Sequence, residues 1–187
     1  GTAVYAVDVD GDGDMDVLGA GEGHEWQMQV SGGGIFWWEN DGSGSFAIHK
    51  IDSTFLGAQF VYAADVDGDG DMDVLGAANY VNNITWWEND GNENFTGHTI
   101  DNGKFHSVHA ADVDSDGDMD VLGADYFAND ILWYENDGNE NFTKYTIENH
   151  LPMAQSVYAA DLDGDGDMDV LGTANYGGDI NWWENDG

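Results

Sequence analysis

Four short segments of the chain carry aspartate at every second position. In the segment 65–73, which reads DVDGDGDMD, carboxylates stand at loop positions 1, 3, 5, 7 and 9. The other copies are 8–16, 112–120 and 161–169. Five carboxylates this close together repel one another strongly unless a cation lies among them. Dense, hard oxygen ligands favour Ca²⁺, which accepts roughly six to eight oxygens in a flexible shell.

The spacing of the other residues in these segments separates two kinds of calcium loop. Glycine at positions 4 and 6 lets the backbone wrap closely around an ion, although Ser115 takes position 4 in the third copy. An EF-hand loop opens with the same pattern, but it requires a bidentate glutamate at position 12 and flanking helices. Position 12 is glycine here and the flanks are strand-like, so we exclude an EF-hand. The four position-12 residues are Gly19, Gly76, Gly123 and Gly172.

The aspartate segments belong to a fourfold internal repeat. Each is preceded by a Val-Tyr-Ala-Ala-Asp-like run and followed by Asp-Val-Leu-Gly, and an aromatic block comes later in each repeat. The block is Trp-Trp-Glu-Asn at 37–40, 86–89 and 182–185, and Trp-Tyr-Glu-Asn at 133–136. Repeats of about 48 residues indicate a propeller architecture. We divide one domain, 1–187, into repeats at approximately 1–57, 58–104, 105–153 and 154–187, the last lacking its fourth strand.

Each repeat is predicted to form four short strands. In the second repeat these are 61–66, 73–79, 84–88 and 95–100, rich in β-branched and aromatic residues and bounded by glycine. The segment 89–94 between the last two has the Asn/Asp/Gly chemistry of a hairpin turn. No window has convincing helical periodicity. We therefore expect an all-β fold of β-propeller-type blades with four antiparallel strands, alone or within a larger propeller.

The aspartate pattern followed by Val-Leu-Gly-Ala, in repeats of this length, resembles the FG-GAP/VCBS repeat family, which includes the integrin α-subunit propeller. The resemblance covers essentially the whole chain, although that family usually closes seven blades. It implies about four Ca²⁺ ions, each held by side chains at positions 1, 3, 5 and 9 and by the backbone carbonyl at position 7. The implied side-chain ligands are Asp8, Asp10, Asp12, Asp16, Asp65, Asp67, Asp69, Asp73, Asp112, Asp114, Asp116, Asp120, Asp161, Asp163, Asp165 and Asp169. The implied carbonyl ligands are those of Asp14, Asp71, Asp118 and Asp167.

Composition limits the partners. The formal net charge of −35, from 38 acidic and 3 basic residues, disfavours nucleic acid and direct membrane insertion. With 41% hydrophobic and 13% aromatic residues the chain can nevertheless bury a core. There is no cysteine, so disulfides and thiolate chemistry are excluded.

Two features outside the loops offer ligand sites. Trp86 and Trp87 must point to opposite faces of their strand, which suits a core between blades, while the aromatic blocks also suit glycan stacking. The insertion from Gly21 to Gly34 is the one segment that is not repeated. Its His24 and Trp26 are therefore candidate ligand-binding residues.

We expect a secreted or cell-surface, calcium-stabilised module for adhesion or scaffolding, with an extracellular protein or glycan as partner. One alternative is a lectin-like glycan-binding module with tryptophan platforms. Another is a subunit that self-associates into a ring or filament through unpaired edge strands. No catalytic residues are assigned, and the chain is expected not to be an enzyme. A non-catalytic module of a polysaccharide-active enzyme stays open.

Overall fold

The computed structural model describes residues 3–22 and 33–187, and the regular structure in these ranges is β-strand. His24 and Trp26 lie outside the described residues. None of the described segments forms a helix that is long and apolar enough to cross a membrane. The strands are β1 (Ala3–Val7), β2 (Asp16–Gly21), β3 (Gly34–Asn40), β4 (Phe46–Asp52), β5 (Ala58–Ala64), β6 (Asp73–Ala78), β7 (Asn83–Asn89), β8 (Phe95–Asn102), β9 (Phe105–Ala111), β10 (Asp120–Asp125), β11 (Asp130–Asn136), β12 (Phe142–Glu148), β13 (Ala154–Ala160), β14 (Asp169–Ala174) and β15 (Ile180–Trp183).

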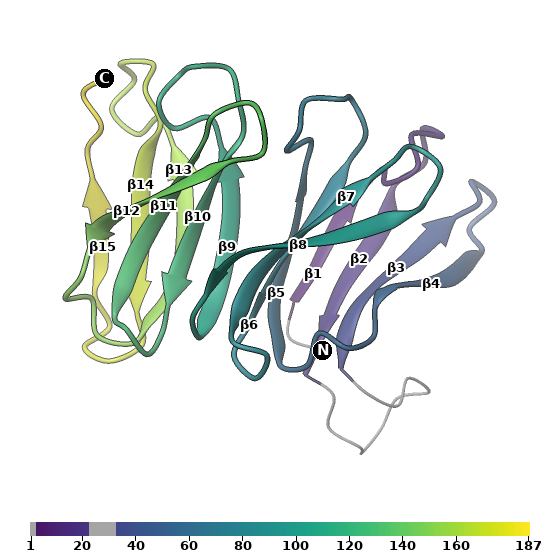
Figure 1. Cartoon of the computed structure of the whole chain (residues 1–187), viewed down its shortest axis with the longest axis horizontal. Coiled ribbons are helices and arrows are strands. Elements are labelled where there is room, and N and C mark those ends of the chain that lie inside the picture. The colour runs from purple at the N-terminus through teal and green to yellow at the C-terminus, as the bar shows by residue number, and fades with distance from the viewer. Residues whose placement is uncertain (1–2, 23–32) are drawn as a thin grey trace.

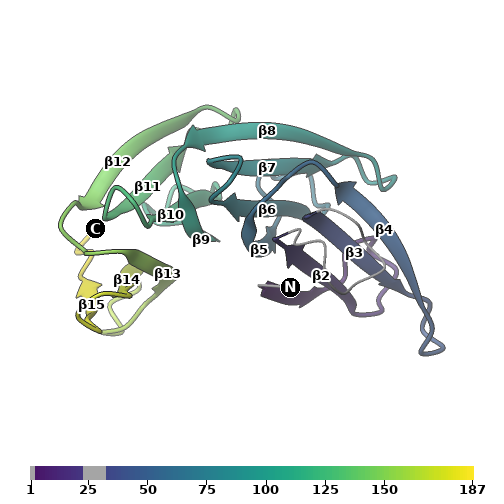
Figure 2. The same cartoon turned by 90° about the horizontal axis from the view of Figure 1, so that it is seen from below.

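The strands form antiparallel sheets in which each strand pairs with the next one in the chain (Figure 1). Among the described residues these are blade 1 (β1–β4), blade 2 (β5–β8), blade 3 (β9–β12) and the three-stranded blade 4 (β13–β15). The blades follow one another around an open arc, with β5, β9 and β13 on its inner side and β4, β8 and β12 on its outer side (Figure 2). The predicted all-β, blade-like fold is confirmed.

The first strand of the second repeat lies slightly earlier than predicted. It was expected at 61–66, whereas β5 spans Ala58–Ala64. At its start, Ala58 pairs with Ala78 across a register shift, so that the alternating pattern is interrupted near Gln59. At its end, the Val66 N–H donates to the Asp73 side chain, 2.9 Å away, instead of to a strand. The strand therefore ends where the aspartate loop begins.

The hydrophobic core lies between successive blades and contains the aromatic pairs. Trp86 is buried in the cluster between blades 2 and 3, while Trp87 is buried in the cluster between blades 1 and 2. The two neighbouring side chains thus point to opposite faces, as the alternation of a strand requires. A Cβ built on Gly76, at loop position 12, would lie 2.7 Å from the Trp87 ring. The glycine that replaces the EF-hand glutamate is therefore the residue that makes room for this tryptophan.

Aromatic rings form a row along the inner strands, one from each blade. Tyr5 lies 4.8 Å from Tyr62, Tyr62 lies 4.6 Å from His109, and His109 lies 4.3 Å from Tyr158, measured between ring centroids. His109 is buried, and this burial lowers its pKa to about 4 because the charged imidazolium is poorly solvated there. The row continues from blade to blade at the inner side of the arc.

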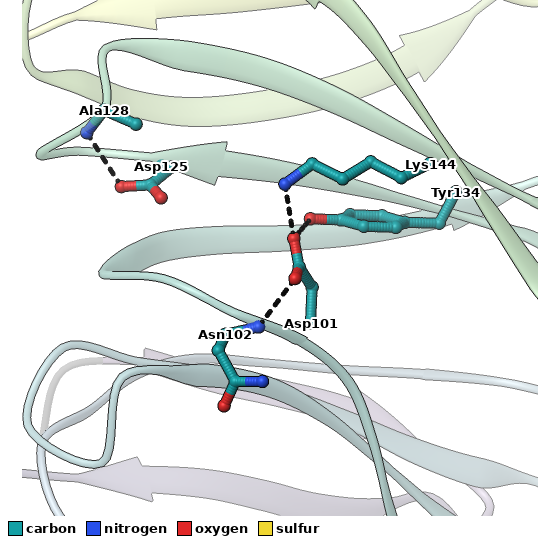
Figure 3. A network of polar contacts seen from close by, with 6 residues as sticks. All are labelled: Asp101, Asn102, Asp125, Ala128, Tyr134 and Lys144. Atoms are coloured by element: carbon teal, nitrogen blue, oxygen red, sulfur yellow. Dashed lines mark hydrogen bonds and ion pairs between the residues drawn. The ribbon is translucent and has the colours of Figure 1, made fainter.

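A polar network joins blades 2 and 3 where the third repeat departs from the tryptophan pair (Figure 3). The Tyr134 hydroxyl and the Lys144 ammonium donate to Oδ2 of Asp101, at 2.7 and 2.6 Å. The Asn102 N–H donates to Oδ1 of the same carboxylate at 2.8 Å. Burial alone would raise the pKa of Asp101, but the bonds from Lys144 and Tyr134 outweigh it and hold the pKa below its usual range. The network gives the hydroxyl group of Tyr134, whose ring is buried in the core, a hydrogen-bond partner.

Candidate metal centre

The aspartate at position 1 organises each loop. In the second loop, the N–H groups of Gly68 and Gly70 donate to the two oxygens of Asp65, at 2.8 and 3.1 Å. Both glycines have positive φ, 76° and 99°, which bends the chain back toward the carboxylate. Loops 1 and 4 repeat this arrangement around Asp8 and Asp161. The backbone therefore wraps around the position-1 carboxylate in these loops.

The aspartate at position 9 anchors the loop to the blade. Asp73 is fully buried at the start of β6. Its Oδ2 accepts from the Val66 N–H at 2.9 Å, and its Oδ1 accepts from the Asn89 N–H at 2.8 Å. One carboxylate thus ties the beginning of the loop to the end of β7. Asp16, Asp120 and Asp169 make the corresponding pairs of bonds.

Carboxylate oxygens from different loop positions converge on one point. In each described loop, three aspartates place one oxygen apiece within 4.8 Å of the others. Oxygens around a single Ca²⁺, each about 2.3–2.6 Å from the ion, lie within roughly 5 Å of one another. The spacing and the all-oxygen donor set therefore fit Ca²⁺. The clusters are Asp8, Asp10 and Asp16; Asp65, Asp67 and Asp73; Asp112, Asp114 and Asp116; and Asp161, Asp163 and Asp169.

The third loop gathers its oxygens differently. Its cluster contains Asp116 from position 5 in place of Asp120 from position 9. Ser115 stands at position 4 with φ of 63°, and the N–H groups of Asp116 and Gly117 donate to Asp112 at 3.1 Å. In the other loops the donors to position 1 come from positions 4 and 6. A serine held in a left-handed conformation thus accompanies a shift of one donor along the loop.

The position-7 side chain turns away from the cluster. A Cβ built on Gly91, in the hairpin between β7 and β8, would collide with the Asp71 carboxylate. Gly42 meets Asp14 and Gly138 meets Asp118 in the same way. The position-7 aspartates are absent from the clusters among the described residues. This arrangement fits a carbonyl rather than a side-chain role for position 7.

In the second loop, burial and mutual repulsion disfavour the charged form of Asp67 and Asp73. Burial raises the pKa of Asp67, and the nearby Asp69 and Asp65 charges raise it further. Burial raises the pKa of Asp73 to about 6, although bonds from Asn89 and Val66 oppose the shift. A bound cation would reverse this balance because it stabilises all the charges at once.

The site includes a side chain that the sequence analysis did not single out. Asn89, at the end of the aromatic block, donates from Nδ2 to the Val9 carbonyl of blade 1 at 3.2 Å and to Met72 of its own blade at 3.1 Å. Asn136 reaches Val66 and Asn185 reaches Val113 in the same way. Each asparagine therefore links its blade to position 2 of the preceding aspartate loop. The sequence signal that could have indicated these asparagines is the Glu-Asn pair that ends all four aromatic blocks.

The other candidate features lie in the blade bodies. Trp37 and Trp86 are buried, and each stacks on a histidine of the outer strand, His49 at 4.6 Å and His98 at 4.7 Å. A pocket of about 360 Å³ lies between blades 3 and 4. Trp133, Ile147 and Trp183 line it together with acidic residues, among them Asp114, Asp167 and Glu184.

Comparison with protein-family models identifies the repeat. The chain matches the FG-GAP-like repeat over residues 8–76, 65–123 and 112–172, so the matches together cover most of it. Each match begins at position 1 of one loop and ends at position 12 of the next. The chain belongs to the FG-GAP-like repeat family. A search of curated proteins finds no match.

Proposed function

We propose that this chain is a calcium-stabilised module for adhesion or scaffolding, located outside the cell or at its surface. The observation that carries the proposal is the recurrence of a carboxylate cluster in each of the described loops, with positions 1 and 3 in every cluster. Loops of this kind, with clusters only partly shielded from water, suit the millimolar calcium of an extracellular medium. Each ion would connect the start of a loop to the strand that follows it, and thereby stiffen the blade.

The proposal assigns no catalytic step to the chain. Among the described residues, the carboxylate clusters that could hold an ion are those of the loops, and oxygens of the second loop already accept N–H groups of the same loop. A carboxylate that holds a structural ion and bonds to the backbone has little freedom to act on a substrate. Rigid, repeated surfaces around a metal-stiffened frame suit recognition of a partner.

The functional test is a binding screen against extracellular matrix proteins in millimolar calcium and then in EDTA. We expect binding to a protein ligand in calcium, lost in EDTA and weakened by Asp73→Asn. The matched control is Asp71→Asn, whose side chain faces the hairpin and not the cluster. Turnover of a polysaccharide by the calcium-loaded chain would contradict the proposal. Localisation is tested separately, by detecting the native protein in medium, cell-surface and cytosolic fractions.

A lectin-like function is the second candidate, and the pocket between blades 3 and 4 favours it. Aromatic faces beside carboxylates are a common combination for holding a sugar ring. A glycan array in calcium tests this candidate with Trp183→Ala. The control is Trp38→Ala, the same repeat position in blade 1. Glycan binding that only Trp183→Ala removes would support the candidate, whereas an array without hits would contradict it.

A further inference from the structure

The first tryptophan of an aromatic block carries a buried N–H group that lacks a hydrogen-bond partner. Among the described residues, Nε1 of Trp37, Trp86 and Trp133 forms no hydrogen bond. Trp37 and Trp86 are each 1% exposed, so solvent does not reach their rings. A buried donor without an acceptor costs free energy, and native structures contain few of them. The recurrence of this donor at one repeat position in three blades therefore points to a common cause.

In blade 2, this N–H group lies on the same face as the position-9 carboxylate. Trp86 pairs with Leu75 across β6 and β7, and Asp73 lies two residues before Leu75. Because side chains two residues apart on a strand share a face, Asp73 and Trp86 both face blade 3. Burial raises the pKa of Asp73, and the Trp86 N–H is one of the donors that lower it again. The unpartnered donor is thus aimed at a member of the carboxylate cluster.

The same pairing recurs in the neighbouring blades. Trp133 pairs with Leu122 across β10 and β11, and Asp120 lies two residues before Leu122. Burial raises the pKa of Asp120 to about 6, while N–H groups that include the Trp133 indole oppose the shift. In blade 1 the same register places Trp37 on the face of Asp16. The arrangement therefore belongs to the repeat and not to one loop.

Packing fixes the direction of the indole N–H. The Trp86 ring stacks on His98 of the outer strand at 4.7 Å, with 27° between the ring planes. Phe142 of blade 3 meets the same ring edge-on at 6.4 Å. The Trp133 ring stacks on Tyr145 in the corresponding way, at 4.9 Å and 27°. A ring held in a packed core cannot turn its N–H toward another acceptor without disturbing its neighbours.

The hydrogen bonds of Asp73 leave an acceptor site for this donor. A carboxylate offers about four lone-pair sites on its two oxygens. The Val66 and Asn89 N–H groups occupy two of them, at 2.9 and 2.8 Å. A cation held by the cluster would occupy a third. The remaining site is available to the Trp86 indole N–H, and the carboxylate is then fully used.

We propose that the first tryptophan of the block is a positioning residue of the cation site, whose indole N–H donates to the position-9 carboxylate when the loop binds calcium. The tryptophan does not touch the ion; it holds the carboxylate in the orientation in which an oxygen faces the cluster. Loss of a donor of this kind lowers metal affinity by about 10- to 100-fold. The inference deepens the proposed function and rests on it, because it takes calcium as the ion in the loop. The pairs that carry this role are Trp37 with Asp16, Trp86 with Asp73, and Trp133 with Asp120.

The second tryptophan of the block provides the contrast. Trp87 is buried like Trp86, but it lies in the cluster between blades 1 and 2. Its Nε1 lies beside Gly97 of the outer strand, where a Cβ built on that glycine would approach it to 3.1 Å. The two neighbouring indoles therefore have the same chemistry, but Trp86 alone of the two lies on the face of the Asp73 carboxylate.

The experiment is a calcium titration of the chelator-treated chain, followed by NMR through the indole N–H and backbone N–H resonances. The Gly70 amide, which donates to Asp65, reports binding in the second loop. Trp86→Phe removes the donor and part of the ring. Replacement of Trp86 by benzothienylalanine, in which sulfur takes the place of the N–H, removes the donor and keeps the shape of the ring. Trp87→Phe is the matched control on the opposite face.

We expect the indole N–H resonances of Trp37, Trp86 and Trp133 to move as calcium fills the loops, because each N–H gains an acceptor. The Trp87 resonance should stay in place. The calcium affinity of the second loop should fall about tenfold in both Trp86 variants and change by less than about twofold in Trp87→Phe. Melting temperatures in EDTA separate this effect from packing. There, both phenylalanine variants should lose similar stability, whereas the benzothienylalanine variant should keep the stability of the original chain.

An unchanged calcium affinity in the benzothienylalanine variant overturns the inference and leaves the calcium proposal intact. This variant supplies the test even if Trp86→Phe does not fold. Equal losses of affinity in Trp86→Phe and Trp87→Phe also overturn the inference, because packing alone would then explain them. A chain whose loop amides do not respond to calcium overturns both the inference and the proposed function.

Discussion

The two parts of each blade are held together by different forces. The body of blade 2 packs Trp86 and Trp87 into apolar clusters on either side, where hydrophobic burial stabilises the fold without any ion. The loop 65–73 buries little apolar surface and concentrates negative charge instead. Asp73 belongs to both parts, since it lies in a buried strand and in the carboxylate cluster. The comparison indicates that packing determines the blade, and under the proposed function a bound cation would determine how stably its loop closes.

Removal of calcium is expected to have the largest effect. With calcium about fifty-fold above Kd, each site contributes roughly 2.3 kcal/mol and four independent sites about 9 kcal/mol. For a chain of this size the melting temperature should then fall by about 20 °C in EDTA. Calorimetry with and without EDTA measures this, with Mg²⁺ as the control ion. A melting temperature that is unchanged in EDTA would show that packing of the blade bodies alone accounts for stability.

Asp73→Asn tests the residue shared by loop and body. An amide offers one acceptor oxygen where the carboxylate uses two, so either Val66 or Asn89 loses its partner. This substitution also removes calcium binding by the loop 65–73. We therefore expect the unfolding free energy in calcium to fall by about 3 kcal/mol. Urea unfolding of this variant beside Asp71→Asn gives the measurement. Equal effects of the two substitutions would contradict the different roles of positions 9 and 7.

The pH dependence of stability tests the packed body of the blade separately from the aspartate loops, because His109 lies in that body. Because the folded pKa of His109, about 4, lies below the unfolded value of about 6.5, the unfolded chain binds the proton first. Stability is therefore lost as the pH falls from 6.5 toward 4, by about 2 kcal/mol between pH 7 and pH 5. His109→Tyr places at this position the tyrosine that the other inner strands carry, and it should abolish this pH-dependent loss of stability. The quantity to compare is the pH-induced change in unfolding free energy of the two proteins, both in saturating calcium; identical changes would refute the assignment.

Gly91→Ala probes the contact between the hairpin and the loop. The new methyl group meets the Asp71 carboxylate and also requires a left-handed backbone, since φ is 68–70° at Gly42 and Gly91. Gly44→Ala carries a similar backbone penalty in open space. We expect Gly91→Ala to cost about 1 kcal/mol more than Gly44→Ala by urea unfolding. Equal losses of unfolding free energy in the two variants would mean that the hairpin moves to accommodate the methyl group without disturbing the loop.

Ser115→Gly should have the smallest effect. It relieves a left-handed serine at the position where the other loops have glycine. We expect a gain of about 0.5 kcal/mol in calcium, from urea midpoints. A loss of stability would indicate that the serine hydroxyl contributes to the third loop.

The sequence predicted the parts of the molecule that depend on local pattern. Alternation placed Trp86 and Trp87 on opposite faces, and the aspartate spacing indicated the positions that cluster, including Asp65 and Asp67. Contacts between blades could not be predicted in the same way, because they join residues that are far apart in the chain. The bond from Asn89 to Val9 and the substitution of Asp116 for Asp120 in the third cluster depend on backbone placement that spacing does not reveal.

Calcium titration of the chelator-treated chain by isothermal calorimetry tests the central claim most directly. The account predicts about four ions per chain, matching the described clusters, and about one fewer for Asp73→Asn. Asp71→Asn should retain the full number. A chain that binds no calcium, while keeping its fold, would contradict the account.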